Sequence, residues 1–504
     1  MPLAGPSIAI AGSRLHVRQR TTIHRRSEQL GLHEDDMNSP DLKNDASHQV
    51  WELDRRHFLH PFTHFESYED SGSLIISGGS GSEMTDSNGQ TYLDMIGGLW
   101  CNNIGLGRKE MADAIAEQVA KLSYSSTFTD MSNEPAARLA SRLAELAPGD
   151  LNRVHFSTGG STAVDSALRL AHYCQQCAGR PEKVHVIARR QAYHGSTYAT
   201  ISIGYKEADR RHGFRYIEDT IHHVSEPDLY RAPNGMGEAE FCDHLVKEFE
   251  DKIAEIGPDR VAAFFAEPVM GAGGVLVPPG DYLKRMHEVC KRNDILYVSD
   301  EVVTAFGRLG HWFASEDVFG IVPDIICSAK GLSSGYLPIG ATIYSDRIHE
   351  IISTGDPSRV YTSGFTYAGH PVCCVAALKN IEIMERENIL AHAREVGDYF
   401  GERLRDLEGM KLVGNVRGIG LMRCLENVLD RTTKEALPED VDIGKRVSDA
   451  AESLGVLVRP IGRLNVMSPP LVVTKSEIDF AVDRLGQAIE RVHDDLVREG
   501  WTPV

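Results

Sequence analysis

The hydrophobic pattern between about residues 150 and 345 alternates between two kinds of segment. Short apolar runs rich in β-branched and aromatic residues end in glycine-rich or charged turns, and a helical pattern follows each turn. This order predicts an α/β fold built on a doubly wound, mostly parallel sheet. The clearest strands are expected at 184–188, 261–266, 295–299 and 325–329.

Two segments, one within this region and one near the C-terminal end, show the apolar stripe of an amphipathic helix. The stretch after residue 160 places apolar residues at the i, i+3, i+4, i+7 spacing of a buried helix face, at Val164, Ala167, Leu168 and Ala171. Near the C-terminal end, residues 476–499 predict an amphipathic helix with its stripe at Ile478, Ala481, Leu485, Ile489 and Val492. Both stripes need a partner surface, so both helices are expected to pack on a core.

Composition narrows the class of protein. The 504 residues include 53 Lys and Arg against 72 Asp and Glu, a formal net charge of −19. This balance argues against nucleic-acid binding, which usually needs a basic face. The chain is 42% hydrophobic and 25% charged, as in an ordinary globular protein. We expect no membrane span, because no window approaches 18 uninterrupted apolar residues.

Cysteine and histidine usage indicates neither a disulfide framework nor a metal site. Nine cysteines show no repeating spacing, which favours a reducing compartment and a cytoplasmic protein. Cys174 and Cys177 form a single CxxC inside a helical pattern, and His222 and His223 lack a metal-ligand spacing. We therefore assign no metal.

The first 49 residues differ from the rest. Residues 1–33 hold five arginines and one acid. An extension that is disordered or not native, with Met37 as an alternative start, is the simpler interpretation, and an organelle-targeting segment is the other. We expect residues 1–49 to be dispensable for chemistry.

Polar residues follow the predicted strands where a parallel sheet places its ligands, beyond the carboxyl ends. Tyr193 and His194 follow the first strand, Glu267 follows the second, and Asp300 and Lys330 follow the next two. We expect these side chains to lie close together.

A Gly-Gly-Ser turn precedes the helix that follows residue 160. Gly160 allows close approach to the backbone and Ser161 is expected as the N-cap, so the helix N-terminus could hold a phosphate. An ordinary capped turn is the alternative. The chain has no GxxxxGK[ST] motif, and GAGGVL at 271–276 fails the GxGxxG pattern at its last glycine, which argues against ATP and NAD.

Asp300 and Lys330, which follow two other predicted strands, add two chemical groups to the candidate phosphate site. A buried carboxylate needs a partner such as a protonated ring nitrogen, and a desolvated lysine becomes a nucleophile that can form a Schiff base. With a phosphate cradle they supply three contacts for pyridoxal phosphate. The alternative is a structural salt bridge between Asp300 and Lys330.

Longer motifs carry a resemblance. The stretches QAYHGSTYAT, SDEVVTAFGR, PDIICSAKGLSSGYLPIG and YTSGFTYAGHPV resemble class III pyridoxal-phosphate aminotransferases, most closely the ω-amine or ω-amino acid:pyruvate branch. The resemblance covers about 60–474. It implies fold type I, with a large cofactor-binding domain at 96–370 and a small domain from 50–95 and 371–504. It also implies a homodimer with two shared active sites, and a tetramer of two such dimers stays open.

The resemblance implies roles for the residues at the strand ends. Lys330 would form the Schiff base with the cofactor and carry protons, and Asp300 would keep the pyridine nitrogen protonated. Tyr193 would stack on the ring with Val302 on its other face. His194 and Glu267 would border the cofactor.

The phosphate would be held by residues of two subunits. Gly160 and Ser161 would bind it within one chain, and Thr366 would reach it from the neighbouring subunit. Many members of the family read SGSEA where this chain has Gly159 and Thr162 in TGGSTAVD, so the rim of the site is expected to differ.

The substrate side of the site would be formed by Trp100 and two arginines. Arg459 aligns with the mobile arginine of the ω-branch, and Arg417 matches an arginine that some relatives use for an α-carboxylate. Those relatives gate that arginine with a glutamate where this chain has Ala272, which argues against an ornithine- or GABA-type enzyme.

The resulting prediction is a transaminase that moves an amino group from an ω-amine or ω-amino acid to a keto acid, expected to be pyruvate. The TGGSTAVD variant resembles taurine:pyruvate aminotransferases, while β-alanine, polyamines and aryl-alkyl amines stay open as donors. Other pyridoxal-phosphate reactions of this scaffold, by a mutase, racemase or decarboxylase, are the alternative, and a non-enzymatic binding module is a further one.

Overall fold

The computed structural model describes residues 46–210 and 213–504. The chain divides into two compact units, a larger one of Gly79–Met84 with Thr91–Val504 and a smaller one of Met1–Gly78 with Thr85–Gln90. The predicted extension at 1–49 lies outside the described residues as far as residue 45, while residues 46–49 belong to a helix.

A seven-stranded sheet forms the centre of the larger unit, with the order β4-β10-β9-β8-β7-β5-β6. Every strand is parallel to the others except β10, which runs antiparallel to both neighbours. The predicted, mostly parallel sheet is thereby confirmed. Its strands are β4 (Arg153–Ser157), β5 (His185–Arg189), β6 (Ile221–Val224), β7 (Val261–Ala266), β8 (Leu296–Asp300), β9 (Ile325–Ser328) and β10 (Gly340–Tyr344).

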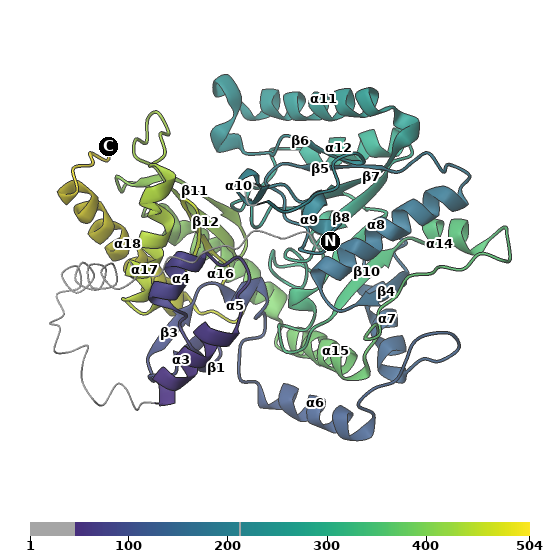
Figure 1. Cartoon of the computed structure of the whole chain (residues 1–504), viewed down its shortest axis with the longest axis horizontal. Coiled ribbons are helices and arrows are strands. Elements are labelled where there is room, and N and C mark those ends of the chain that lie inside the picture. The colour runs from purple at the N-terminus through teal and green to yellow at the C-terminus, as the bar shows by residue number, and fades with distance from the viewer. Residues whose placement is uncertain (1–45, 211–212) are drawn as a thin grey trace, which may run out of the picture. The chain divides into compact units, whose positions relative to one another are not determined.

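Helices cover both faces of this sheet because its strands are apolar on both sides (Figure 1). Val186 and Ala188 of β5 pack with the buried stripe of α8 (Gly160–Cys177), as predicted for that stripe. Ile187, between them, points to the other face and joins the cluster of α11 (Glu238–Ile256) and α12 (Tyr282–Arg292). The alternation of strand side chains thus separates two hydrophobic layers.

The C-terminal part of the larger unit contains a second sheet, which is antiparallel and ordered β11-β12-β15-β14. Its strands are β11 (Val413–Ile419), β12 (Met422–Asn427), β14 (Arg459–Ile461) and β15 (Leu464–Met467). The long helix α18 (Lys475–Arg498) begins at a capping box between Thr474 and Glu477. All five residues of its predicted stripe are buried.

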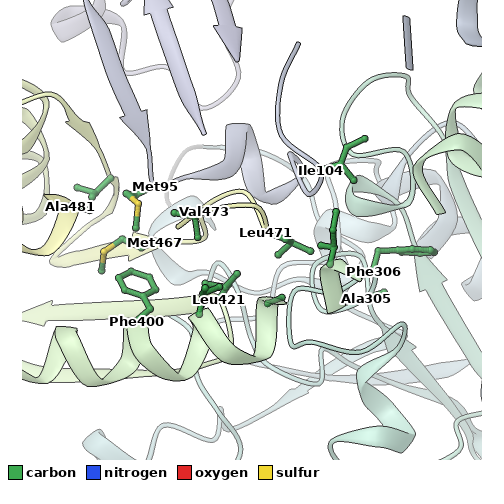
Figure 2. Packing of buried hydrophobic residues seen from close by; sticks show 14 of the residues in the cluster. Met95, Ile104, Ala305, Phe306, Phe400, Leu421, Met467, Leu471, Val473 and Ala481 are labelled. Atoms are coloured by element: carbon green, nitrogen blue, oxygen red, sulfur yellow. The ribbon is translucent and has the colours of Figure 1, made fainter. Parts of the chain in front are cut away.

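One large hydrophobic cluster links these elements. Figure 2 shows Phe400 of α16 (Ile389–Arg405) and Met467 of β15 in the same cluster as Phe306 and Ile104, which come from segments next to the predicted site. Because all four side chains are almost fully buried, the segments that carry the site are fixed to the C-terminal sheet by packing.

The remaining elements of the larger unit surround these sheets. Strand β3 (Thr91–Asp94) pairs in parallel with β13 (Val456–Leu457). The helices are α5 (Gly97–Trp100), α6 (Lys109–Lys121), α7 (Glu134–Leu146), α9 (Thr200–Ile203), α10 (Glu207–Arg210), α13 (Ala314–Asp317), α14 (Asp346–Ser353), α15 (Pro371–Arg386) and α17 (Ile443–Glu452). In the stretches that the structure describes, no helix combines the length and the apolar content that a membrane span requires.

From residue 46 on, where the structure describes it, the smaller unit contains the helices α3 (Ala46–His57) and α4 (Phe65–Ser71). Asp54 of α3 accepts hydrogen bonds from the hydroxyls of Tyr68, at 2.8 Å, and Ser73, at 2.9 Å. These bonds connect the two helices within the unit. Strands β1 (Ile76–Ser80) and β2 (Glu83–Asp86) follow α4 in the chain.

Candidate active site

The carboxyl ends of the parallel strands bring together most of the residues that the sequence predicts. The backbone N–H of Tyr193 donates to Oε1 of Glu267 at 3.2 Å, which connects the segment after β5 with the end of β7. His194 and Asp300 are in contact at 2.8 Å, which connects the same segment with the end of β8. These contacts confirm that residues up to 106 positions apart in the sequence meet at one edge of the sheet.

Asp300 is held by two donors. Its Oδ2 accepts from Nδ1 of His194, and its Oδ1 accepts from the backbone N–H of Val302 at 3.1 Å. A carboxylate only accepts, so this contact places the imidazole proton on Nδ1. The two side chains are 0% and 5% exposed. The pair therefore fixes the orientation of a buried carboxyl group.

Lys330 begins a short 3-10 helix, Lys330–Leu332, directly after β9. Its φ of 41° lies in the left-handed region, where a lysine is uncommon, and such backbone strain is typical of functional sites. Burial lowers the pKa of Lys330, and the charge of Arg459 lowers it further, while Asp300, Cys101 and Glu267 raise it. Because the net shift is downward, more of the amine is neutral and nucleophilic than in a free lysine.

The structural salt bridge considered as an alternative is not seen. Across the part of the chain that the structure describes, no ion pair joins Asp300 to Lys330, and the close partner of Asp300 is His194. Asp300 and Lys330 still influence each other electrostatically. A nearby carboxylate and an unpaired lysine are what a covalently bound pyridine cofactor needs.

The N-terminus of α8 differs from the prediction in one respect. Ser161 is not the N-cap, because the helix begins at Gly160, its N-cap is Gly159, and no side chain caps it. The hydroxyl of Ser161 instead accepts from the backbone N–H of Ser196 at 3.0 Å. Helix amides without a side-chain acceptor fit a phosphate group, which would take the place of a capping side chain.

Close packing explains the glycine at this turn. A Cβ at Gly160 would lie 2.9 Å from Cγ1 of Val302, so the start of α8 approaches Val302, two residues after Asp300, as closely as a glycine allows. The hydroxyl of Thr162 donates to the carbonyl of Gly159 at 2.9 Å and secures the turn. The uncapped helix, the Asp300–His194 pair and Lys330 together fit pyridoxal phosphate.

Glu267 organises the turn that follows β7. Its Oε2 accepts from the backbone N–H of Gly271 at 2.8 Å, while its Oε1 holds Tyr193. Burial raises the pKa of Glu267, and Asp300 raises it too, whereas His194 and Arg189 lower it. The side chain therefore positions backbone on both sides of the site.

Trp100 lies against the same turn. The side chain is 5% exposed, and a Cβ at Gly271 would lie 3.0 Å from its ring. It belongs to a small hydrophobic cluster with Val275 and Leu464. The structure thus places Trp100 against the turn that Glu267 holds, and its role as a wall for the substrate stays a prediction.

The two predicted arginines have different surroundings. The pKa of Arg459, on β14, is lowered by burial and raised only by Tyr193, and no acidic side chain in the described part of the chain forms an ion pair with it. Arg417, on β11, is bound to Glu426 at 2.7 Å. Only Arg459 is therefore free of a neutralising carboxylate.

Thr366 is exposed, and its carbonyl accepts from the hydroxyl of Tyr124 at 2.9 Å. The contacts within one chain thus connect it to Tyr124 rather than to α8. Its predicted contact with a phosphate of a neighbouring subunit stays a prediction.

Two charged residues near the site were missed by sequence reasoning. Burial lowers the pKa of Lys206, and Arg459 lowers it as well, while Asp209 and Glu267 raise it, so Lys206 lies within electrostatic reach of the site. Glu426 is fully buried beneath Arg417. Neither stands in a motif, and a lysine in a loop or a glutamate in a strand gives no signal of its own.

Comparisons with known proteins agree with this geometry. The family model for class-III aminotransferases matches residues 66–489. A putrescine–pyruvate aminotransferase of Pseudomonas aeruginosa is 37% identical over 436 residues, covering 86% of this chain and 94% of that protein. A diaminobutyrate–2-oxoglutarate transaminase of Halomonas elongata is 38% identical over 457 residues, covering 89% and 97%.

Solved structures give the same result. An amine transaminase from an uncultivated Pseudomonas species, solved in its PLP-bound form, superimposes with a TM-score of 0.83 and 38% sequence identity. The match covers 86% of this chain and 99% of that one.

Proposed function

Since the chain belongs to the class-III aminotransferases, which use pyridoxal phosphate, we propose that it transfers the amino group of an ω-amine or ω-amino acid to pyruvate. The observation that carries the choice of acceptor is the difference between the two arginines. Arg459 has no neutralising carboxylate among the described residues, whereas Glu426 neutralises Arg417. A single free guanidinium suits a keto acid with one carboxylate.

The residues of the site would hold the cofactor from several sides. The first amides of α8, at Gly160 and Ser161, would bind its phosphate, and Asp300, oriented by His194, would bind its ring nitrogen. Tyr193 and Val302 would flank the ring. When bound, pyridoxal phosphate supplies the electron sink that amino transfer requires.

Lys330 would hold the cofactor covalently and then move the proton of the donor carbon. Its lowered pKa favours this role, because an amine with a pKa closer to neutrality can both take and return a proton. Asp300 would stabilise the positive charge on the ring nitrogen during this proton transfer, and Glu267 holds the backbone N–H of Tyr193. Lys330, Asp300 and Glu267 all lie at the carboxyl ends of strands of the central sheet.

The donor is proposed to carry its amino group away from any carboxylate. Arg459 can bind a carboxylate or sulfonate at the far end of a donor such as taurine or β-alanine, and the same arginine then binds pyruvate. A relative at 37% identity is named a putrescine–pyruvate aminotransferase, so polyamines and aryl-alkyl amines belong to the same donor panel.

A second acceptor, 2-oxoglutarate, is favoured by one observation. Lys206 interacts electrostatically with Arg459 and Glu267, and we propose it as the second cation that a second carboxylate would need. A relative at 38% identity is named a diaminobutyrate–2-oxoglutarate transaminase. The preference between pyruvate and 2-oxoglutarate therefore tests whether Arg459 alone, or Arg459 together with Lys206, binds the carboxylates of the acceptor.

The test is a matrix of donors and acceptors. Purified holoenzyme is incubated with taurine, β-alanine, putrescine or 1-phenylethylamine and with pyruvate or 2-oxoglutarate, and the amino acid product is quantified. We expect alanine to form faster than glutamate, Lys330→Ala to form neither, and Arg459→Ala to lose pyruvate affinity by about a hundredfold, as for loss of a charged hydrogen-bonded contact. Faster glutamate formation would reject pyruvate as the acceptor, and product formation by Lys330→Ala would reject the assigned base.

We also propose a homodimer with shared active sites. Apolar side chains that are 40% to 60% exposed gather near Thr366, namely Leu122, Tyr124, Phe128, Met131 and Tyr367. The rings of Tyr124 and Tyr367 are 6.1 Å apart, and Phe128 lies against Gly364. An exposed apolar patch of this kind is typical of a subunit interface. Sedimentation should give a dimer mass, and Thr366→Ala should weaken cofactor binding without changing that mass.

Two further parts of the proposal concern the whole chain. A cytoplasmic location is supported by the nine cysteines, all of which are free thiols. The domain limits of 50–95 and 371–504 for a small domain and 96–370 for a large one are proposed from the family resemblance.

A further inference from the structure

The buried ion cluster around Glu426 is not explained by cofactor binding. Glu426 lies on β12 and its side chain is 0% exposed. It accepts from Arg417 at 2.7 Å, from Arg463 at 2.7 Å and from Arg231 at 2.6 Å. Burial raises the pKa of this carboxyl, but the three guanidinium groups overcome burial and hold the pKa at about 2. The carboxylate is therefore charged at any physiological pH.

Glu426 is not placed like a movable gate. Strand β12 is hydrogen-bonded to β11 on one side and to β15 on the other. In the β11–β12 register Arg417 pairs with Cys424, so Arg417 and Glu426 are diagonal neighbours on one face of the sheet. A carboxylate in a central strand stays where the sheet puts it, unlike the loop glutamate that the family resemblance would place at Ala272.

Arg417 has little capacity left for a substrate. Its Nε donates to the carbonyl of Gly274 at 2.8 Å, and its Nη1 donates to Asn415 at 3.0 Å and to Glu426. Three of the five N–H donors of a guanidinium are thus used within the protein. Turning toward a substrate would leave Glu426 with one partner fewer in a buried environment, which is costly.

The contact with Gly274 connects this cluster to the site. Gly274 closes the turn that begins at Gly271, and Glu267 holds the other end of that turn through the N–H of Gly271. Trp100 lies against Gly271. Arg417 therefore supports, from the outside, the turn whose inner side faces Trp100.

We propose that Arg417, held by Glu426, is a positioning residue that supports the wall of the donor pocket by fixing the 271–274 turn beside Trp100, and that Arg459 alone receives the carboxylate or sulfonate of the substrate. This inference rests on the proposed function for its substrates. It assigns to Arg417 a role that differs from direct recognition of an α-carboxylate.

The two roles predict different selectivity. If Arg417 only positions the turn, its substitution lowers kcat/KM for every donor by a similar factor, because a displaced Trp100 affects charged and uncharged donors alike. If Arg417 binds the substrate, its substitution affects only donors that carry a negative group. The ratio of kcat/KM for β-alanine to that for 1-phenylethylamine separates the two.

The informative variant is Arg417→Lys, which keeps a cation for Glu426 but removes the Nε–H that holds Gly274. We expect kcat/KM to fall about tenfold for both donors, through KM rather than kcat, with the ratio within about twofold of wild type. Arg459→Ala should lower the ratio by about tenfold or more. Arg463→Lys is the matched control, because Arg463 also binds Glu426 and is 41% exposed, and it should leave both donors unchanged.

A binding measurement without turnover completes the test. Propionate carries a carboxylate but no amino group, and its affinity for the holoenzyme is measured by calorimetry. Arg459→Ala should abolish binding, and Arg417→Lys should keep the Kd within about threefold of wild type, well short of the tenfold that losing a direct ion contact implies. A selective loss of β-alanine or of propionate in Arg417→Lys would overturn the inference, as would unchanged kinetics for both donors. Propionate binding that depends on Arg459 in an enzyme without transamination would instead count against the proposed function.

Discussion

The glycine that follows His194 gives a sharp prediction about the phosphate site. Gly195 has a φ of +125°, which L side chains rarely adopt, and a Cβ there would lie 2.5 Å from Oγ of Ser161 and 2.7 Å from its Cα. Ser196, the next residue, donates its N–H to that same hydroxyl. The variant Gly195→Ala should therefore push Ser161 away from the start of α8.

The size of the effect follows from two contributions. Forcing a non-glycine residue into this backbone region costs about 1–3 kcal/mol, and a Cβ placed within 2.7 Å of backbone costs about 1–3 kcal/mol more in displaced neighbours. The sum is about 2–6 kcal/mol. Because the displaced atoms belong to Gly195 and Ser161, we expect about 3 kcal/mol of it to appear as weaker cofactor binding, roughly a hundredfold rise in Kd.

The assay is a titration of apoenzyme with pyridoxal phosphate, followed by visible absorption, together with thermal unfolding of the apoenzyme. Gly179→Ala is the matched control. Gly179 also has a positive φ, +75°, lies just beyond the other end of α8, and has nothing within 4 Å of an added Cβ. The control should lower stability by about 1 kcal/mol and leave cofactor affinity unchanged. Equal cofactor affinities for wild type and Gly195→Ala would refute the reasoning.

Three further predictions concern charged groups. Burial lowers the pKa of Lys330 while Asp300 raises it. The rate at which apoenzyme captures pyridoxal phosphate should therefore reach half its maximum below pH 10.5, and Asp300→Asn should move that midpoint lower. A midpoint at or above pH 10.5 would contradict the lowered pKa of Lys330. His194→Phe leaves Oδ2 of Asp300 without its donor and should weaken cofactor binding by about tenfold to a hundredfold, as for a charged hydrogen bond, in the same titration; unchanged affinity would remove the positioning role of His194. The pKa of Glu426 is lowered from 4.5 to about 2, so its contribution of about 3 kcal/mol to the free energy of unfolding is fully present above pH 4.5 and lost as the pH falls toward 2. Urea unfolding should show this loss of stability in wild type and not in Glu426→Gln. Parallel pH profiles of the two proteins would contradict the prediction.

The sequence predicts the strands well because their signal is local. The apolar run at 261–266 coincides with β7, and the runs at 184–188 and 295–299 fall within one residue of β5 and β8. An apolar segment between polar turns forms a strand wherever it is buried on both faces. The last residue depends on hydrogen bonding to a neighbouring strand, which the segment itself does not contain.

Caps and charge pairs are harder to predict. Ser161 has the side chain of an N-cap and precedes a clear helical stripe, yet Gly159 is the N-cap and the serine accepts from Ser196. Asp300 and Glu301 are adjacent and acidic, and only the family resemblance, not the local hydrophobic pattern, separates their roles. Only in the folded chain does Asp300 meet His194, whereas Glu301 turns away to accept from Thr304 and the segment at Ala314.

Buried carboxylates explain why the site is better defined than its loops suggest. Glu267 holds the segments at Tyr193 and Gly271, Glu301 holds Ala314, and Glu426 holds Arg417. Each of these carboxyl groups accepts several hydrogen bonds, so losing any one loop contact leaves a buried acceptor without its donor, and moving these loops is therefore costly. A loop that is held in this way can specify a substrate as firmly as a strand does. Glu426 lies outside the substrate site, so its substitution should lower activity toward all donors alike, through the turn that Arg417 holds, without touching a reacting atom.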